Sequence, residues 1–150
     1  MTSRIEEALS LADKGYSCGQ AILGTYGPFF DLDRDTAYKL ASSMAAGFGG
    51  QGQTCGAVTG AYLVIGLRFG SSNVDEIECR ELTFELVQQF TQTFESWHNS
   101  TQCNTLLGHD ITTMEGLKTV RQQGLARKLC PAFIRSAIEI LEALLWEDYG

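Results

Sequence analysis

The chain has 150 residues, 44% of them hydrophobic, and 18 acidic and 11 basic side chains give it a formal net charge of -7 at pH 7. A chain of this length is most simply a single domain, 1–150, with a core of its own. Its hydrophobic content excludes a disordered protein, and its acidic balance argues against a nucleic-acid-binding protein, which needs a basic face.

The first eleven residues include Glu6 and Glu7 and have neither the basic nor the apolar segment of a signal peptide. The longest apolar run, 57–67, is about half as long as a bilayer span requires. We therefore expect a cytoplasmic protein without membrane insertion. In that reducing compartment, the five cysteines are expected to be thiols, metal ligands or catalysts rather than disulfides.

Apolar residues recur at helical spacing along the chain, and no segment shows the alternation of a strand. In chain order, helices are predicted over residues 3–14, 17–26, 33–45, 55–69, 74–97, 100–107, 113–123 and 131–145. Between the third and fourth lies a glycine-rich loop, 47–54, in which several residues can adopt positive φ. The predicted fold is therefore a compact all-α domain of about six to eight helices with a Gly-rich loop.

Four of the five cysteines lie near predicted helix N-termini. Cys18 follows Ser17, Cys55 follows Thr54, Cys103 lies within one turn of Ser100-Thr101, and Cys130 precedes Pro131. Hydroxyl side chains are common N-caps, and proline is favoured at the first helical position. Unpaired N–H groups at such ends can lower a cysteine pKa to about 3.5–7.5, so thiolates are expected at all four.

The remaining cysteine, Cys79, lies on the apolar stripe of a predicted helix and is expected to be buried as a small hydrophobic residue. The other four are separated by 37, 48 and 27 residues. This spacing contains no CxxC pair, which argues against a structural zinc site and a thioredoxin-like motif. It allows an iron–sulfur cluster whose ligands converge on folding. His98 and His109 flank Cys103 and are alternative ligands, although a surface position is more common.

The fourth predicted helix has small residues one turn apart, Gly56 with Gly60 and Ala57 with Ala61. Such a stripe lets a second helix approach closely. Core packing is the favoured interpretation, and contact with a second copy in a homodimer is the alternative.

Four segments together resemble the C_GCAxxG_C_C family: YSCGQA at 16–21, GGQGQTCGAVTGA at 49–61, CNTLLG at 103–108, and CP at 130–131. The resemblance covers the chain from Tyr16 almost to its end, although the family label orders the central residues Gly-Cys-Ala where this chain has Cys55-Gly56-Ala57. It implies a redox-active protein whose functional residues are Cys18, Cys55, Cys103 and Cys130. The family is also similar to a domain of split-Soret-type cytochromes, which implies an iron–sulfur cluster. No CxxCH occurs, so covalent c-type haem is excluded.

Three functions follow as hypotheses. In the first, the four cysteines bind an iron–sulfur cluster such as [2Fe–2S] and transfer electrons to a redox partner protein. Close approach of the backbone to the cluster sulfurs is then expected at Gly49, Gly50, Gly52 and Gly56. The second is a thiol–disulfide oxidoreductase in which Cys55 attacks and Cys18, Cys103 or Cys130 resolves the disulfide. The third is a non-catalytic helical interaction module with structural cysteines.

Overall fold

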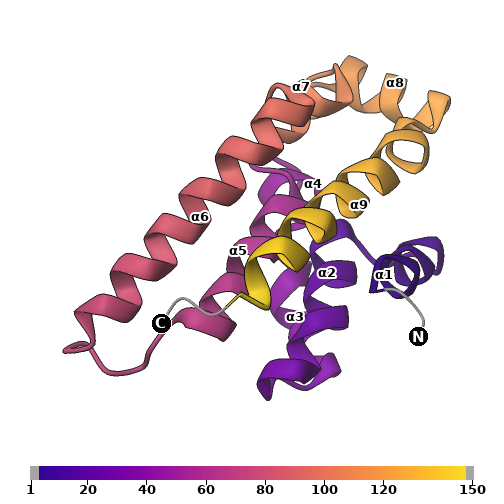
Figure 1. Cartoon of the computed structure of the whole chain (residues 1–150). Coiled ribbons are helices and arrows are strands. Elements are labelled where there is room, and N and C mark those ends of the chain that lie inside the picture. Colours follow the sequence, from indigo (N-terminus) through magenta and orange to yellow (C-terminus); the bar gives the residue numbers. More distant parts are fainter. Residues whose placement is uncertain (1–3, 148–150) are drawn as a thin grey trace.

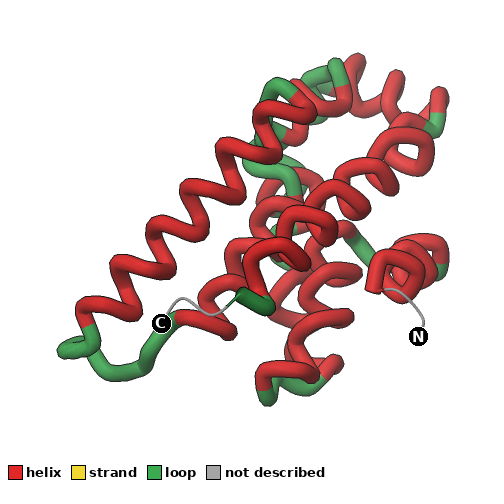
Figure 2. The backbone as a smooth tube through the Cα atoms, viewed as in Figure 1, coloured by secondary structure: helices red, strands yellow, loops and turns green. Residues whose placement is uncertain are grey.

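The computed structural model describes residues 4–147, and these form a helical domain (Figures 1 and 2). The elements are α1 (Arg4–Asp13), α2 (Cys18–Tyr26), the 3-10 turn η1 (Gly27–Phe30), α3 (Arg34–Ser42), α4 (Ala45–Phe48), α5 (Gly56–Phe69), α6 (Ile77–His98), α7 (Cys103–Leu107), α8 (Met114–Gln123) and α9 (Leu125–Leu145). Within residues 4–147 there is no strand, and the β-type contact is an isolated antiparallel bridge between Thr54 and Gln102. The predicted all-α class is therefore confirmed.

Helix α5 is the central helix of the domain. Its sequence is almost entirely apolar, so it lacks the polar face of an amphipathic helix. The residues at its first six positions are all buried. It packs against α2, α6 and α9. Figure 1 shows α6 and α9 as the long helices of the domain, joined by α7 and α8 at one end. None of the helices in the described part of the chain has both the length and the apolar character needed to cross a membrane.

Glycines bring α2 and α5 into close contact. A Cβ placed on Gly19 would lie 3.2 Å from the Gly56 carbonyl oxygen, and one on Gly60 would lie 3.2 Å from the Gly19 Cα. The stripe of small residues predicted on α5 is therefore a core contact within the chain. This crossing brings the first residues of α2 and α5 together, because Gly19 and Gly56 each lie next to a cysteine.

The last helix differs from its prediction. It begins at Leu125 rather than at Pro131, so Pro131 lies inside α9. Residues 125–129 read Leu-Ala-Arg-Lys-Leu, all good helix formers, and Gly124 with a φ of 60° separates them from α8. Beyond the proline, a buried row that includes Phe133, Ile134 and Leu141 holds the helix on the core. Packing therefore outweighs the hydrogen bond that the proline removes.

The described residues form two apolar cores of unequal size. The main core includes residues of α2 and α5, of α6 from Leu86 onward, and of α9 from Phe133 onward. A satellite core, Leu107, Ile111 and Val120, lies beneath α7 and α8. Cys130 packs against both cores, so it lies where they meet.

Candidate functional site: a cluster of four cysteines

The fold brings together four cysteine side chains that are far apart in sequence. The Cys18 side chain interacts directly with that of Cys130, and it also interacts electrostatically with Cys55 and Cys103. Cys55 in turn interacts with Cys103 and Cys130. All four are free thiols in this structure. We call this group the cysteine cluster.

Cys18 is the first residue of α2, and its position is fixed by the helix cap. The Gln20 backbone N–H donates to the Ser17 hydroxyl at 3.4 Å, and the Ser17 N–H donates to the Gln20 side-chain oxygen at 3.0 Å. This reciprocal arrangement is a capping box, which fixes the start of a helix. The predicted Ser17 cap is therefore confirmed. A Cβ added to Gly56 would lie 3.6 Å from the Cys18 Cβ and only 3.2 Å from the Gly19 backbone nitrogen, so this position of α5 is tightly packed against the start of α2.

Backbone hydrogen bonds join the segment before α5 to the start of α7. The Cys55 N–H donates to the Thr101 carbonyl oxygen at 2.7 Å, and the Cys103 N–H donates to the Gln53 carbonyl oxygen at 2.6 Å. These bonds surround the Thr54–Gln102 bridge and fix Cys55 and Cys103 side by side. The predicted caps were wrong here: Cys55 itself is the N-cap of α5 and Gln102 that of α7, because Thr54 and Thr101 are engaged in the bridge segment.

The loop before Cys55 contains a left-handed turn. Ala46, Gly47, Phe48 and Gly49 have φ values of 53°, 68°, 64° and 64°, so the short element α4 is not a right-handed helix. A left-handed conformation costs about 1–2 kcal/mol for a residue with a Cβ, and two of these four residues are not glycine. The Gln53 N–H donates to the Gly47 carbonyl oxygen at 3.0 Å, which returns the chain toward Cys55.

The four glycines predicted to approach a cofactor separate into two pairs. Gly52 is buried against the Asn104 side chain, and Gly56 is buried beside Cys18. Gly49 and Gly50 are exposed, and no heavy atom lies within 4 Å of a Cβ placed on Gly50. Asn104 fastens the loop to the turn that follows α7, because its side-chain oxygen accepts from the Ile111 N–H at 2.9 Å. Gly52 and Gly56 thus shape the cluster, whereas Gly49 and Gly50 face solvent.

Burial dominates the ionisation of two of the cluster thiols, Cys55 and Cys103. It raises the pKa of Cys55 to about 12, although the backbone N–H groups of Ala57 and Val58 oppose the shift. It also raises the pKa of Cys103 to about 11. Hydrogen bonding with Cys130, together with burial, raises the pKa of Cys18 well above its ordinary value, and the same contact lowers that of Cys130.

The lowered pKa expected at all four cysteines is therefore found at Cys130 alone, which lies in the interior of a helix rather than at its start. At Cys55 and Cys103, desolvation of the charged form outweighs the effect of the helix dipole, and at Cys18 the hydrogen bond with Cys130 adds to desolvation. A sequence shows a helix end more readily than it shows how deeply that end is buried.

The buried thiols predict that the protein loses stability at alkaline pH. The unfolded chain releases the Cys55 proton near the ordinary pKa of 9.0, whereas the folded chain holds it up to about 12. The folded state therefore binds more protons over this interval, and its free energy of unfolding falls as pH rises. Urea unfolding of the reduced protein between neutral pH and about pH 10.5 measures this slope. Cys55→Ala should unfold more easily at neutral pH but lose stability less steeply, and an unchanged slope would contradict the assignment.

Two residues considered from the sequence lie apart from the cluster. Cys79 is half-exposed and donates to a Glu76 carboxylate oxygen at 3.3 Å, so the prediction that it is buried was wrong. It precedes Leu82, the first hydrophobic residue of α6 that packs against the main core. The Nε2 of His98 is hydrogen-bonded to the Ser136 hydroxyl at 2.8 Å. Within residues 4–147, no three His, Cys, Asp or Glu side chains are arranged to hold one metal ion.

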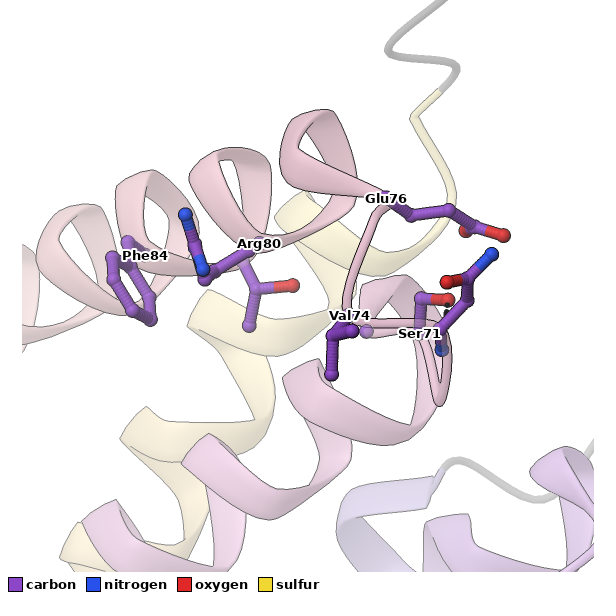
Figure 3. A pocket seen from close by; sticks show the side chains of 8 residues that line it. Ser71, Val74, Glu76, Arg80 and Phe84 are labelled. Carbon is purple, nitrogen blue, oxygen red and sulfur yellow. Dashed lines mark hydrogen bonds between the residues drawn. The ribbon is translucent and has the colours of Figure 1, made fainter.

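A surface hollow of about 270 Å³ lies at the turn between α5 and α6 (Figure 3). Val74, Arg80 and Phe84 are among its lining residues, and no cysteine is. No residue of α6 before Leu86 is buried, so this hollow is remote from the buried residues of the main core. The cysteine cluster is the stronger candidate for the functional site.

Comparison with protein-family models matches residues 16–144 to the C_GCAxxG_C_C family, whose description is "Putative redox-active protein". The matched span contains all four residues of the cysteine cluster. No curated protein and no solved structure matches the chain.

Proposed function

Because the chain belongs to the C_GCAxxG_C_C family, we propose that it is a thiol–disulfide redox protein whose reactive pair is Cys18 and Cys130. The observation that carries this proposal is the interaction of these two side chains, which belong to helices that pack against each other, α2 and α9. A disulfide forms only between cysteines whose Cβ atoms can come within about 4.5 Å of each other. The packing of both cysteines against the main core supports their pairing.

The proposed reaction transfers two electrons from the protein to a disulfide substrate. The Cys130 thiolate attacks one substrate sulfur, the substrate S–S bond breaks, and its other sulfur leaves as a thiolate. Cys18 then loses its proton and attacks the Cys130 sulfur of the mixed disulfide, which releases the second substrate thiolate. The products are a Cys18–Cys130 disulfide and two substrate thiols, which take up the two protons that the protein thiols released.

Cys130 is assigned as the attacking residue because its pKa is the lowered one of the pair. A larger thiolate fraction at neutral pH favours attack. Cys55 suits the attacking role less well, because it is 5% exposed and its pKa is raised to about 12. Cys18, whose proton is held in the contact with Cys130, is suited to the resolving role.

The assignment is tested with 2,2′-dithiodipyridine, a neutral disulfide that releases a coloured thione. In a Cys79→Ser background, which removes the half-exposed thiol outside the cluster, the reduced protein should release two thiones and form a Cys18–Cys130 disulfide that mass spectrometry identifies. Cys18→Ser should stop at a mixed disulfide on Cys130, and Cys130→Ser should not form that adduct. A first adduct on another cysteine, or a disulfide that omits Cys18 and Cys130, would overturn the proposal.

An iron–sulfur cluster bound by Cys18, Cys55, Cys103 and Cys130 is the second candidate. The mutual interaction of four thiols from separate elements supports it, since thiolates are the usual ligands of such clusters. The described residues contain no group of three side chains placed to hold a single metal ion, whereas a [2Fe–2S] cluster shares four cysteine ligands between two irons. Anaerobic purification followed by visible spectroscopy and iron and sulfide assays tests this candidate. Stoichiometric iron and sulfide that are lost in Cys55→Ser would favour the cluster over the dithiol.

A further inference from the structure

Basic residues are concentrated in one segment of this acidic chain. Residues 116–138 contain five of the eleven basic residues and none of the eighteen acidic residues. These five, which we call the basic face, are Lys118, Arg121, Arg127, Lys128 and Arg135. All five are exposed, and the ion pairs found among the described residues involve none of them. Their charge is therefore available to a ligand.

The basic face lies on α9, which contains Cys130, and on α8, which packs against α9. Lys118 and Arg121 lie on α8. Their neighbour Val120 belongs to the satellite core, and both Leu117 and Cys130 pack against that core. On α9, Arg127 precedes Cys130 by three residues, so the two share one side of the helix. A surface hollow of about 310 Å³ on α8 is lined by Met114, Leu117, Lys118, Arg121 and Gln122. Positive charge and apolar surface thus occur together near a half-exposed thiol.

We propose that the basic face recruits the substrate of Cys130, and that this substrate is a disulfide with carboxylates beside its sulfur–sulfur bond. The inference rests on the proposed thiol–disulfide function. A cluster of unpaired positive charge raises the local concentration of an anion and speeds its encounter. The rest of the chain combines six basic with eighteen acidic residues and repels the same ligand. An acidic disulfide is therefore directed toward the side of the molecule where α9 holds Cys130.

A phosphate-bearing ligand would also be attracted to these charges, but it would give the neighbouring thiol nothing to react with. A carboxylated disulfide uses both features of the surface. The same chemistry occurs in small acidic disulfides and in acidic protein segments that contain a disulfide. The positive charge of the basic face and the neighbouring thiol together define the substrate as a carboxylated disulfide. The experiment distinguishes a small molecule from a protein segment as its source.

The test compares two aromatic disulfides that differ in charge. 5,5′-Dithiobis(2-nitrobenzoate) carries two carboxylates, and 2,2′-dithiodipyridine is neutral; both report thiol attack by colour. In the Cys79→Ser background, the double variant Lys118→Gln/Arg121→Gln should react about 3- to 10-fold more slowly with the anionic probe and change less than about 2-fold with the neutral probe. Added salt should slow the anionic reaction of the parent protein more than that of the variant.

Arg80→Gln provides the matched control, because Arg80 is an exposed basic residue at the remote hollow on α6. It should leave both rates unchanged. Equal effects of the double variant on both probes, or an equal loss in Arg80→Gln, would overturn the basic face as the recruiting surface. If the neutral probe fails to react at Cys130 at all, the proposed function fails instead, so the two failures are distinguishable.

The source of the substrate is then tested with glutathione disulfide and with a glutamate-rich peptide that contains a disulfide. A rate that falls in the double variant for either substrate supports the proposal and identifies which source the surface accepts. If neither rate depends on Lys118 and Arg121, the recruitment of acidic disulfides is refuted.

Discussion

Replacing Gly47 with alanine is expected to lower the free energy of unfolding by about 2–4 kcal/mol. Gly47 has a φ of 68°, and a Cβ there would lie 2.3 Å from the Gln53 backbone nitrogen. The alanine would therefore be strained in the left-handed turn and would collide with backbone that cannot move without displacing Gln53. Urea unfolding of the reduced protein, followed by circular dichroism, measures the change.

Gly50→Ala is the control for this substitution. Gly50 also has a positive φ, 82°, but a Cβ there would have no heavy atom within 4 Å. Its expected cost is only the conformational one, about 1 kcal/mol. Because the Gln53 carbonyl oxygen accepts a hydrogen bond from the Cys103 N–H, Gly47→Ala should also alter the rate at which Cys103 is alkylated. Equal losses of stability in the two variants would show that the close contact at Gly47 contributes nothing.

Replacing Phe94 with alanine is expected to cost about 3–5 kcal/mol. Phe94 is fully buried on α6, with its ring 6.0 Å from that of Phe90 and 6.4 Å from that of Phe133 on α9. The truncation would leave a cavity between the two long helices. Thermal unfolding in the presence of reductant measures the change.

Phe84→Ala is the matched control on the same helix. Phe84 is 59% exposed, and removing its ring should change stability by less than about 0.5 kcal/mol. Similar losses at the two positions would mean that the part of α6 before Leu86 is held against the core as firmly as the part that follows, contrary to the burial pattern.

The helices could be predicted from the sequence because their signals are local. The Ser17 cap and the apolar stripe of α9 depend on residues within one or two turns of one another. The N-terminus of α9 could not be placed in this way. Pro131 is a good first residue for a helix, and only the packing of Phe133 and Ile134 shows why the helix continues through it.

The candidate site was predictable in its residues but not in its electrostatics. The sequence pattern points to Cys18, Cys55, Cys103 and Cys130, and the fold brings them together. Positive φ was expected in the glycine-rich loop, yet nothing local indicates that Ala46 and Phe48 also adopt it. The burial that raises the pKa of Cys55 depends on elements distant in sequence. The basic face carries a signal that a local charge count would have found, because acidic residues are absent from 116–138.

The contact between Cys18 and Cys130 joins residues near opposite ends of the chain. A covalent bond there would enclose a loop of roughly a hundred residues, which in the chain-entropy description restricts the unfolded ensemble by about 4–5 kcal/mol. By thermodynamic linkage, folding favours formation of this disulfide by the same free energy. That free energy corresponds to a shift of about 100 mV in the reduction potential of the two-electron dithiol–disulfide couple. The architecture that brings the ends of the chain together would therefore make the oxidised protein the more heat-resistant one and the dithiol the stronger reductant.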